Sequence, residues 1–270
     1  MAALTDRPYG AVVQVPHWPS NSAIRRALKK MGMVSRKAIY KPLLKVVHRA
    51  ARRAFATKYA AWTTAQWRRI IFSDEKMFQV RPGGQIRYWK PKDEDRLVAR
   101  CGHITCPFSQ GLMVWAAMDG KGQLKLRRCP PSMNSLGYQA VLGSALHFIK
   151  RRHTGARFQQ DGAAPHTSSS TKAWLVTNGV QMFNDGNWPA CSPDMNPIEH
   201  VWPMVCMFAR ICLQIGRQLK GRIFANREAL WAAIQGAFQN VNKEQILTLY
   251  DSMPTRIAAL RTAKGGYTRF

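Results

Sequence analysis

The sequence predicts a mixed α/β sheet with helices on both faces, preceded by a small, basic, helical arm. Hydrophobic residues make up 46% of the 270-residue chain, which is enough for a sizeable core. Beyond the arm, candidate antiparallel strands come first, and strand and helix patterns then alternate. Lys and Arg total 41 against 14 Asp and Glu, so the net charge is +27. An excess this large predicts a polyanionic partner, foremost nucleic acid.

The arm is predicted to occupy residues 1–62, because residues 25–69 contain no acidic side chain. A first helix is expected over residues 20–31, with Ser20, Asn21 and Ser22 as candidate N-caps and Ile24, Leu28 and Met31 on an apolar face. The opposite, basic face is typical of a helix that binds in a DNA groove, and equally of a solvated surface helix. The candidate DNA-binding residues are Arg25, Arg26, Lys29, Lys30, Arg36 and Lys37.

A second helix is expected over residues 42–59. Its apolar pattern predicts that Val47, Ala54 and Phe55 point inward, and Arg52 is placed among its exposed basic residues. Residues 63–66 then match a capping box that would begin the next segment.

The globular domain is predicted over residues 63–270. Strands are expected at residues 69–80 and 85–89, which form a hairpin, and at 112–118, 123–128, 157–160 and 180–183. Helices are expected at residues 135–149 and 167–178, from residue 196 onward, and at 227–238 and 243–260.

Three carboxylates stand out in a chain with few acids. Asp74 interrupts an apolar strand, and Asp161 ends a short one. Glu199 lies at the third position of a helix that Asn196 would cap and Pro197 would begin. Taken one at a time, each has a structural explanation: a salt bridge for Asp74, a turn for Asp161 and a capping box for Glu199. Together they fall at strand ends and a helix start, where α/β sheets form their sites.

Such a cluster repels itself unless a cation neutralises it, and oxygen ligands suit Mg²⁺ or Mn²⁺. Two such ions about 3.5–4 Å apart activate an attacking water or hydroxyl and stabilise the leaving oxygen of a phosphodiester. The sequence therefore predicts two-metal phosphodiester chemistry on DNA at Asp74, Asp161 and Glu199. A membrane partner is not expected, because no run reaches the roughly 18 apolar residues of a spanning helix.

Several blocks of the chain resemble the Tc1/mariner superfamily of DNA transposases, in that family's order and from about residue 20 to residue 270. The blocks are SDE at 73–75, GLMVW at 111–115, FQQDGAAPHTS at 158–168, WL at 174–175, WPACSPDMNPIEHVW at 188–202 and SMPTRI at 252–257. The SPDMNPIE block is the most specific of them.

The resemblance implies a ribonuclease-H-like catalytic domain whose Asp-Asp-Glu metal triad is Asp74, Asp161 and Glu199. It implies cut-and-paste transposition, in which element ends are nicked by hydrolysis and the freed 3′-OH attacks target DNA. The implied partners are the terminal inverted repeats, the target DNA and a second copy of the chain in a synaptic complex, and the implied location is the nucleus. Among other matching positions, His166 is expected either to orient a metal-bound water or phosphate or to cap the following helix.

Other residues near the triad are expected to be structural. Asp194 is interpreted as a turn residue, and Trp188 and Trp202 as core residues. Pro203 is expected to kink the helix that carries Glu199.

The residues before Ser20 resemble no complete helix-turn-helix unit, so the arm is interpreted as a truncated remnant of a DNA-binding region. This and Pro203 leave a second hypothesis, an inactive transposon-derived DNA-binding protein. A third is a ribonuclease-H-like nuclease that acts on branched DNA or hybrids.

Overall fold

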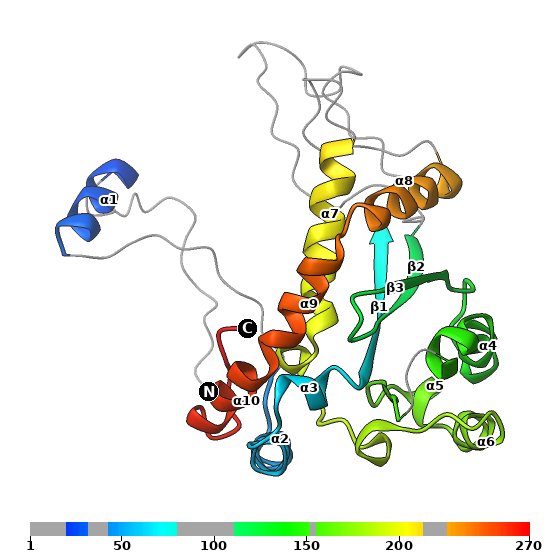
Figure 1. Cartoon of the computed structure of the whole chain (residues 1–270). Helices are drawn as coiled ribbons and strands as arrows, with labels where there is room; N and C mark the ends of the chain where they lie inside the picture. The colour runs from blue at the N-terminus through cyan, green and yellow to red at the C-terminus, as the bar shows by residue number, and fades with distance from the viewer. Residues whose placement is uncertain (1–19, 32–42, 80–110, 152–154, 213–225) are drawn as a thin grey trace, which may run out of the picture. The chain divides into compact units, whose positions relative to one another are not determined.

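The computed structural model describes residues 20–31, 43–79, 111–151, 155–212 and 226–270 (Figure 1). Residues 1–42 and residues 43–270 form two separate compact units. Within the described ranges, no helix has both the length and the apolarity that crossing a membrane requires.

The described part of the first unit is the helix α1 (Asn21–Lys30), as the sequence predicts. Oγ of Ser20 accepts a hydrogen bond from the backbone N–H of Ala23 at 3.2 Å and so caps the first turn. Ile24 and Met31, on the apolar face, are 36% and 69% exposed. These two side chains therefore gain little from burial within this unit.

The second unit is built on a four-stranded mixed sheet. Its strands are β1 (Ile70–Gln79), β2 (Gly111–Met118), β3 (Leu124–Arg128) and β4 (Arg157–Gln159), in the order β3-β2-β1-β4. The β1–β2 and β2–β3 pairs are antiparallel, and β1–β4 is parallel. These four strands confirm the mixed sheet predicted from the sequence, whereas the predicted strand at 85–89 lies outside the described residues.

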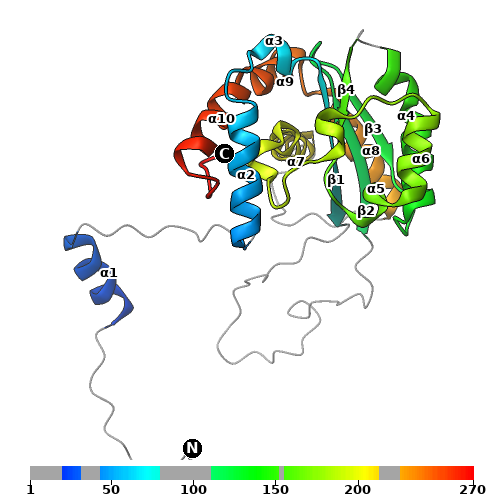
Figure 2. The ribbon, with the colours of Figure 1, turned by 90° about the horizontal axis from the view of Figure 1, so that it is seen from below.

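Helices cover both faces of this sheet. They are α2 (Val46–Lys58), α3 (Thr64–Trp67), α4 (Ser135–Arg151), α5 (Ala164–Thr167), α6 (Ser169–Thr177), α7 (Val201–Cys212), α8 (Arg227–Gln239), α9 (Lys243–Asp251) and α10 (Met253–Thr262). Figure 2 shows α4, α5 and α6 on one side of the sheet and α2, α7 and α10 on the other. The sheet is therefore the middle of three layers.

The alternation of side chains along β1 separates two apolar cores. Ile70 and Phe72 belong to the core beneath α2 and α7, and Ile71 belongs to the core beneath α4. Because neighbouring side chains on a strand point to opposite faces, Asp74 lies on the α7 side and Glu75 on the α4 side.

The structure differs from the predicted elements at three places. Residues 180–183 form no strand, only a single parallel bridge between Met182 and Phe158, because the chain turns away at Asn184 and Asp185, whose φ values are +52° and +54°. Ser168, with φ −58° and ψ 148°, separates α5 from α6. Pro254 has no N–H to bond to a carbonyl one turn earlier, and α10 starts afresh near it.

The helix α2 corrects the prediction for residues 42–59. Val47 is 67% exposed and Ala54 is also exposed, whereas Arg52 is buried together with Phe55. The second compact unit thus begins at Leu43, 20 residues before the boundary that the charge distribution predicts. It begins there because α2 packs through this buried stripe against α10 and the aromatic core.

Arg52 is the centre of a buried network at this junction. Its Nη1 and Nη2 atoms each donate to one carboxylate oxygen of Asp194 at 2.7 Å. Its other acceptors are the carbonyl oxygens of Cys191, Gly265 and Gly266 and the hydroxyl of Ser192, at 2.8–3.0 Å. One side chain thereby ties α2 to residues 191–194 and to the segment that follows α10.

Replacing Arg52 should therefore lower the denaturant concentration at which the second unit unfolds. Arg52→Ala would leave the largely buried Asp194 carboxylate without its charged partner, at a cost of about 3–5 kcal/mol. Arg53→Ala, on the exposed side of the same helix, should change stability by no more than about 0.5 kcal/mol. Chemical denaturation of both variants measures this, and equal small losses would contradict the proposed importance of Arg52.

Candidate active site

A cleft of about 270 Å³ brings together the three carboxylates that the sequence singles out. Asp74 comes from β1, Asp161 from the loop after β4, and Glu199 from a 3₁₀ turn, η4 (Pro197–His200). Gly162, Ala163, Asn196 and residues 188–193 complete the described wall. Positions far apart in the sequence therefore share one cleft at the edge where β4 ends.

Asp74 lies within β1, opposite Ala116 of β2. The indole Nε1–H of Trp202 donates to Oδ2 of Asp74 at 2.7 Å and fixes the carboxyl group toward α7. Burial, followed by the negative charge of Glu199, raises the pKa of Asp74 to about 7. Trp202 is buried as predicted, and it also holds a site residue in place.

Asp161 follows β4 in a tight turn. Its Oδ1 atom accepts from the backbone N–H of Ala163 at 3.0 Å, as in an Asx turn, and lies 2.6 Å from Nδ1 of His166. The contact with His166 is the main reason why the pKa of Asp161 is lowered. About half of the Asp161 side chain remains exposed to the cleft and solvent.

His166 links the cleft to the opposite face of the sheet. Its Nε2 lies 3.5 Å from Oε1 of Glu75, and the Tyr138 ring stacks on it at 4.0 Å. Burial alone would lower the pKa of His166, but the contacts with Asp161 and Glu75 outweigh it and raise the pKa to about 9. A buried imidazolium is therefore held between two carboxylates.

His166 does not cap the next helix. The Oγ atom of Ser168 accepts from the backbone N–H of Thr171 at 3.2 Å and caps α6 instead. His166 contacts the site residue Asp161 instead, and its predicted role in orienting a metal-bound water or phosphate stays a prediction.

Glu199 is placed by the segment that precedes it. The side chain of Asn196 caps η4 by accepting from Ile198 N–H, and its Nδ2 donates to the carbonyl oxygen of Ser73 at 3.0 Å. This bond joins the start of η4 to the residue before Asp74. Burial raises the pKa of Glu199, the charge of Lys76 opposes that rise, and the charge of Asp161 adds to it.

Pro203 does not interrupt the helix as predicted. The α-helix α7 begins at Val201, after the 3₁₀ turn that carries Glu199, so Pro203 falls in its first turn. The backbone N–H groups of a first turn have no acceptor within the helix, and a proline costs little there.

Asp194 has a larger role than the predicted turn residue. It lies in a 3₁₀ turn, η3 (Pro193–Met195), and pairs with Arg52. A further bond runs from Oγ1 of Thr268 to its Oδ2 at 2.8 Å. The sequence signal for Arg52 was its place in one stripe with Phe55 and Tyr59, at helical spacing.

The donor chemistry of the cleft fits a divalent cation. Three carboxylates line it. Burial raises the pKa of Asp74 and of Glu199, and the charge of a neighbouring carboxylate adds to each rise, a repulsion that a cation would relieve. Within the described residues, however, no three His, Cys, Asp or Glu side chains already stand close enough to hold a metal ion. Ion binding would have to draw these carboxylates together.

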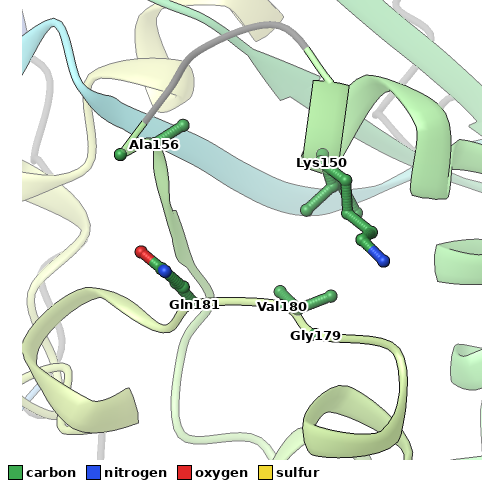
Figure 3. Close-up of a pocket in the computed structure, with 7 residues that line it drawn as sticks. Lys150, Ala156, Gly179, Val180 and Gln181 are labelled. Carbon is green, nitrogen blue, oxygen red and sulfur yellow. The ribbon is translucent and has the colours of Figure 1, made fainter.

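A second cavity, of about 190 Å³, lies beside the end of α4 and the start of β4 (Figure 3). Its described lining includes Lys150, Gln181 and apolar or glycine residues, and none of these is acidic. Its described lining therefore offers no carboxylate to hold a divalent cation.

The candidate DNA-binding residues are only partly described. Arg25, Arg26 and Lys30 are exposed on α1, and Lys29 belongs to the same helix. Arg36 and Lys37 lie outside the described residues. Their contact with DNA stays a prediction.

Comparisons with known proteins agree with this architecture. Residues 69–207, just over half of the chain, match the family described as DDE superfamily endonuclease. The Tcb1 transposase of Caenorhabditis briggsae is 29% identical over 255 residues, which cover 93% of this chain and 89% of that protein. The Tc1 transposase of Caenorhabditis elegans is 29% identical over 264 residues, with the same coverage.

Among solved structures, the Mos1 mariner paired-end complex with Mn aligns with a TM-score of 0.64 and 20% identity. The alignment covers 92% of this chain and 72% of that one. This likeness confirms the ribonuclease-H-like fold.

Binding of a divalent ion should weaken as the pH falls below about 7. Asp74 carries a proton below its raised pKa, and a metal ion must displace that proton, so affinity should fall by up to about tenfold per pH unit and level off at higher pH. Calorimetric titration with Mn²⁺ at several pH values measures this. Asp74→Asn should remove the dependence near pH 7, and an unchanged affinity across neutral pH in the wild type would contradict the assignment.

Proposed function

We propose a DNA-transposase function on the premise that this chain belongs to the DDE superfamily of endonucleases, within the Tc1/mariner group of transposases. The reaction is metal-dependent DNA cleavage followed by strand transfer, as in cut-and-paste transposition. One observation carries the proposal most strongly: Asp74, Asp161 and Glu199 line a single cleft of an endonuclease fold.

We propose that these three carboxylates hold two Mg²⁺ or Mn²⁺ ions. When bound, the ions would activate the attacking oxygen and stabilise the leaving oxygen. The residues around the carboxylates keep them in place: Trp202 holds Asp74, His166 holds Asp161, and Asn196 holds the turn of Glu199.

The chemistry at the cleft is displacement at phosphorus. In the first step a water oxygen attacks a phosphate at an element end, the P–O3′ bond breaks, and a 3′-OH is released. In the second step that 3′-oxygen attacks a phosphate of target DNA and displaces another 3′-oxygen. The side chains contribute a fixed geometry, since each carboxylate is held by a separate element of the fold.

The charge of the chain and its family support DNA and a second copy of the chain as partners. The net charge of +27 and the exposed Arg25, Arg26 and Lys30 support phosphate contacts with the terminal inverted repeats and with target DNA. We also propose that two copies of the chain act together in a synaptic complex, in the nucleus. No specific observation favours the inactive DNA-binding protein, since the predicted kink at Pro203 is absent from α7.

Asp161→Asn should abolish Mn²⁺-dependent nicking of DNA by the purified chain. Losing one metal ligand should reduce the rate by at least about 100-fold, as losing other transition-state contacts does. Asp185→Asn is the matched control, because Asp185 is exposed and its positive φ also suits asparagine. Nicking that survives in Asp161→Asn would overturn the proposed function.

A further inference from the structure

Lys76 lies on the same face of β1 as Asp74. Trp202 contacts the residues two before and two after Lys76. Its indole N–H donates to Asp74 at 2.7 Å, and the centroid of the Trp202 ring lies 6.2 Å from that of the Phe78 ring. Because residues 74, 76 and 78 alternate onto one face, Lys76 stands between these contacts, beside the start of α7. The strand β1 also contacts η4, the turn that carries Glu199.

The position of Lys76 gives it access to both the carboxylates and solvent. Its side chain is exposed, and its positive charge acts on Glu199 against the effects of burial and of Asp161. Two other basic residues of the part of the chain that the structure describes, Arg52 and His166, are held by carboxylates: Arg52 by Asp194, and His166 by Asp161 and Glu75. A lysine, by contrast, is a point charge on a flexible stem.

DNA that enters this cleft meets three carboxylates, so its phosphate must be attracted by positive charge. A divalent ion supplies part of that charge, and a lysine that can turn from a carboxylate to a phosphate supplies more. Lys76 can make such a turn because it lies two residues from Asp74 on the same face of β1, because β1 contacts the turn that carries Glu199, and because its side chain is exposed.

We propose that Lys76, which lies beside the cleft on the strand face of Asp74, binds a phosphate of the DNA that enters it. In the DNA-free protein its ammonium group neutralises part of the charge of Glu199. When DNA lies over the cleft, the ammonium group contacts a non-bridging phosphate oxygen instead. This inference rests on the proposed function, since it takes DNA as the ligand.

The proposal predicts two effects of opposite sign for Lys76→Met, which keeps the length of the side chain. Without DNA, the variant should bind Mn²⁺ about three- to tenfold more tightly, because a partly screened positive charge is gone. Toward DNA it should lose about tenfold in affinity at low salt, and the slope of log affinity against log salt should shrink by about 1. A purely structural defect would weaken both ligands.

The experiment uses the full chain. Mn²⁺ binding is measured by calorimetry without DNA, and binding of a short duplex is measured across a salt series with Ca²⁺ present. Lys76→Arg should keep the salt slope of the wild type, because the charge is kept. Lys172→Met removes an exposed lysine from α6, on the other layer, and should leave Mn²⁺ affinity unchanged.

The proposal is overturned if Lys76→Met leaves Mn²⁺ affinity and the salt slope as in the wild type, or if it weakens Mn²⁺ binding. Failure of the proposed function would look different: the wild type would not nick DNA with Mn²⁺, while the two binding measurements would still decide the role of Lys76.

Discussion

The second unit depends above all on the buried contact between Arg52 and Asp194. A guanidinium group presents five N–H donors in a fixed plane, and here they meet a carboxylate, a hydroxyl and three carbonyl oxygens. These acceptors come from two segments that are distant in the sequence. The wall of the cleft at residues 191–196, and through it Glu199, therefore takes its place from a residue of α2.

The strand β1 carries two carboxylates on opposite faces of the sheet, and both affect the charge of the site. Asp74 faces α7, where burial and Glu199 favour its protonated form, and Glu75 faces α4, where it helps to keep His166 charged. His166 reaches back to Asp161 in the cleft. Two neighbouring residues of one strand thus set the charge of the cleft from opposite sides of the sheet.

Much of the fold follows from local sequence. The strand at Asp74, the capping box at Thr63 and the Asn196 cap depend on periodicity and on short-range hydrogen bonds, and the structure confirms them. The three carboxylates could be singled out because acids are scarce and their motifs are specific. Their placement in one cleft agrees with that prediction, and their role as metal ligands stays a proposal.

The contacts that hold the site could not be predicted in the same way. Helical spacing places Arg52 in one stripe with Phe55 and Tyr59, but the stripe does not show which groups pair with a buried guanidinium. The carboxylate that pairs with Arg52 lies 142 positions later in the sequence. The link from Glu75 through His166 requires knowing that α5 lies against the far face of β1. Pro203 was misjudged because the chain changes from a 3₁₀ turn to an α-helix just before it, a boundary that the sequence pattern did not mark.

The Arg52 network also bears on how the protein forms during synthesis. Its acceptors at Gly265 and Gly266, and the Thr268 hydroxyl on Asp194, come more than 200 residues after Arg52 in the chain and are synthesised long after it. Domains fold largely as units while the chain emerges. A nascent chain would therefore carry all three carboxylates well before the guanidinium of Arg52 has its full set of acceptors. The wall of the cleft would then take its final arrangement only after Gly266 and Thr268 have been synthesised.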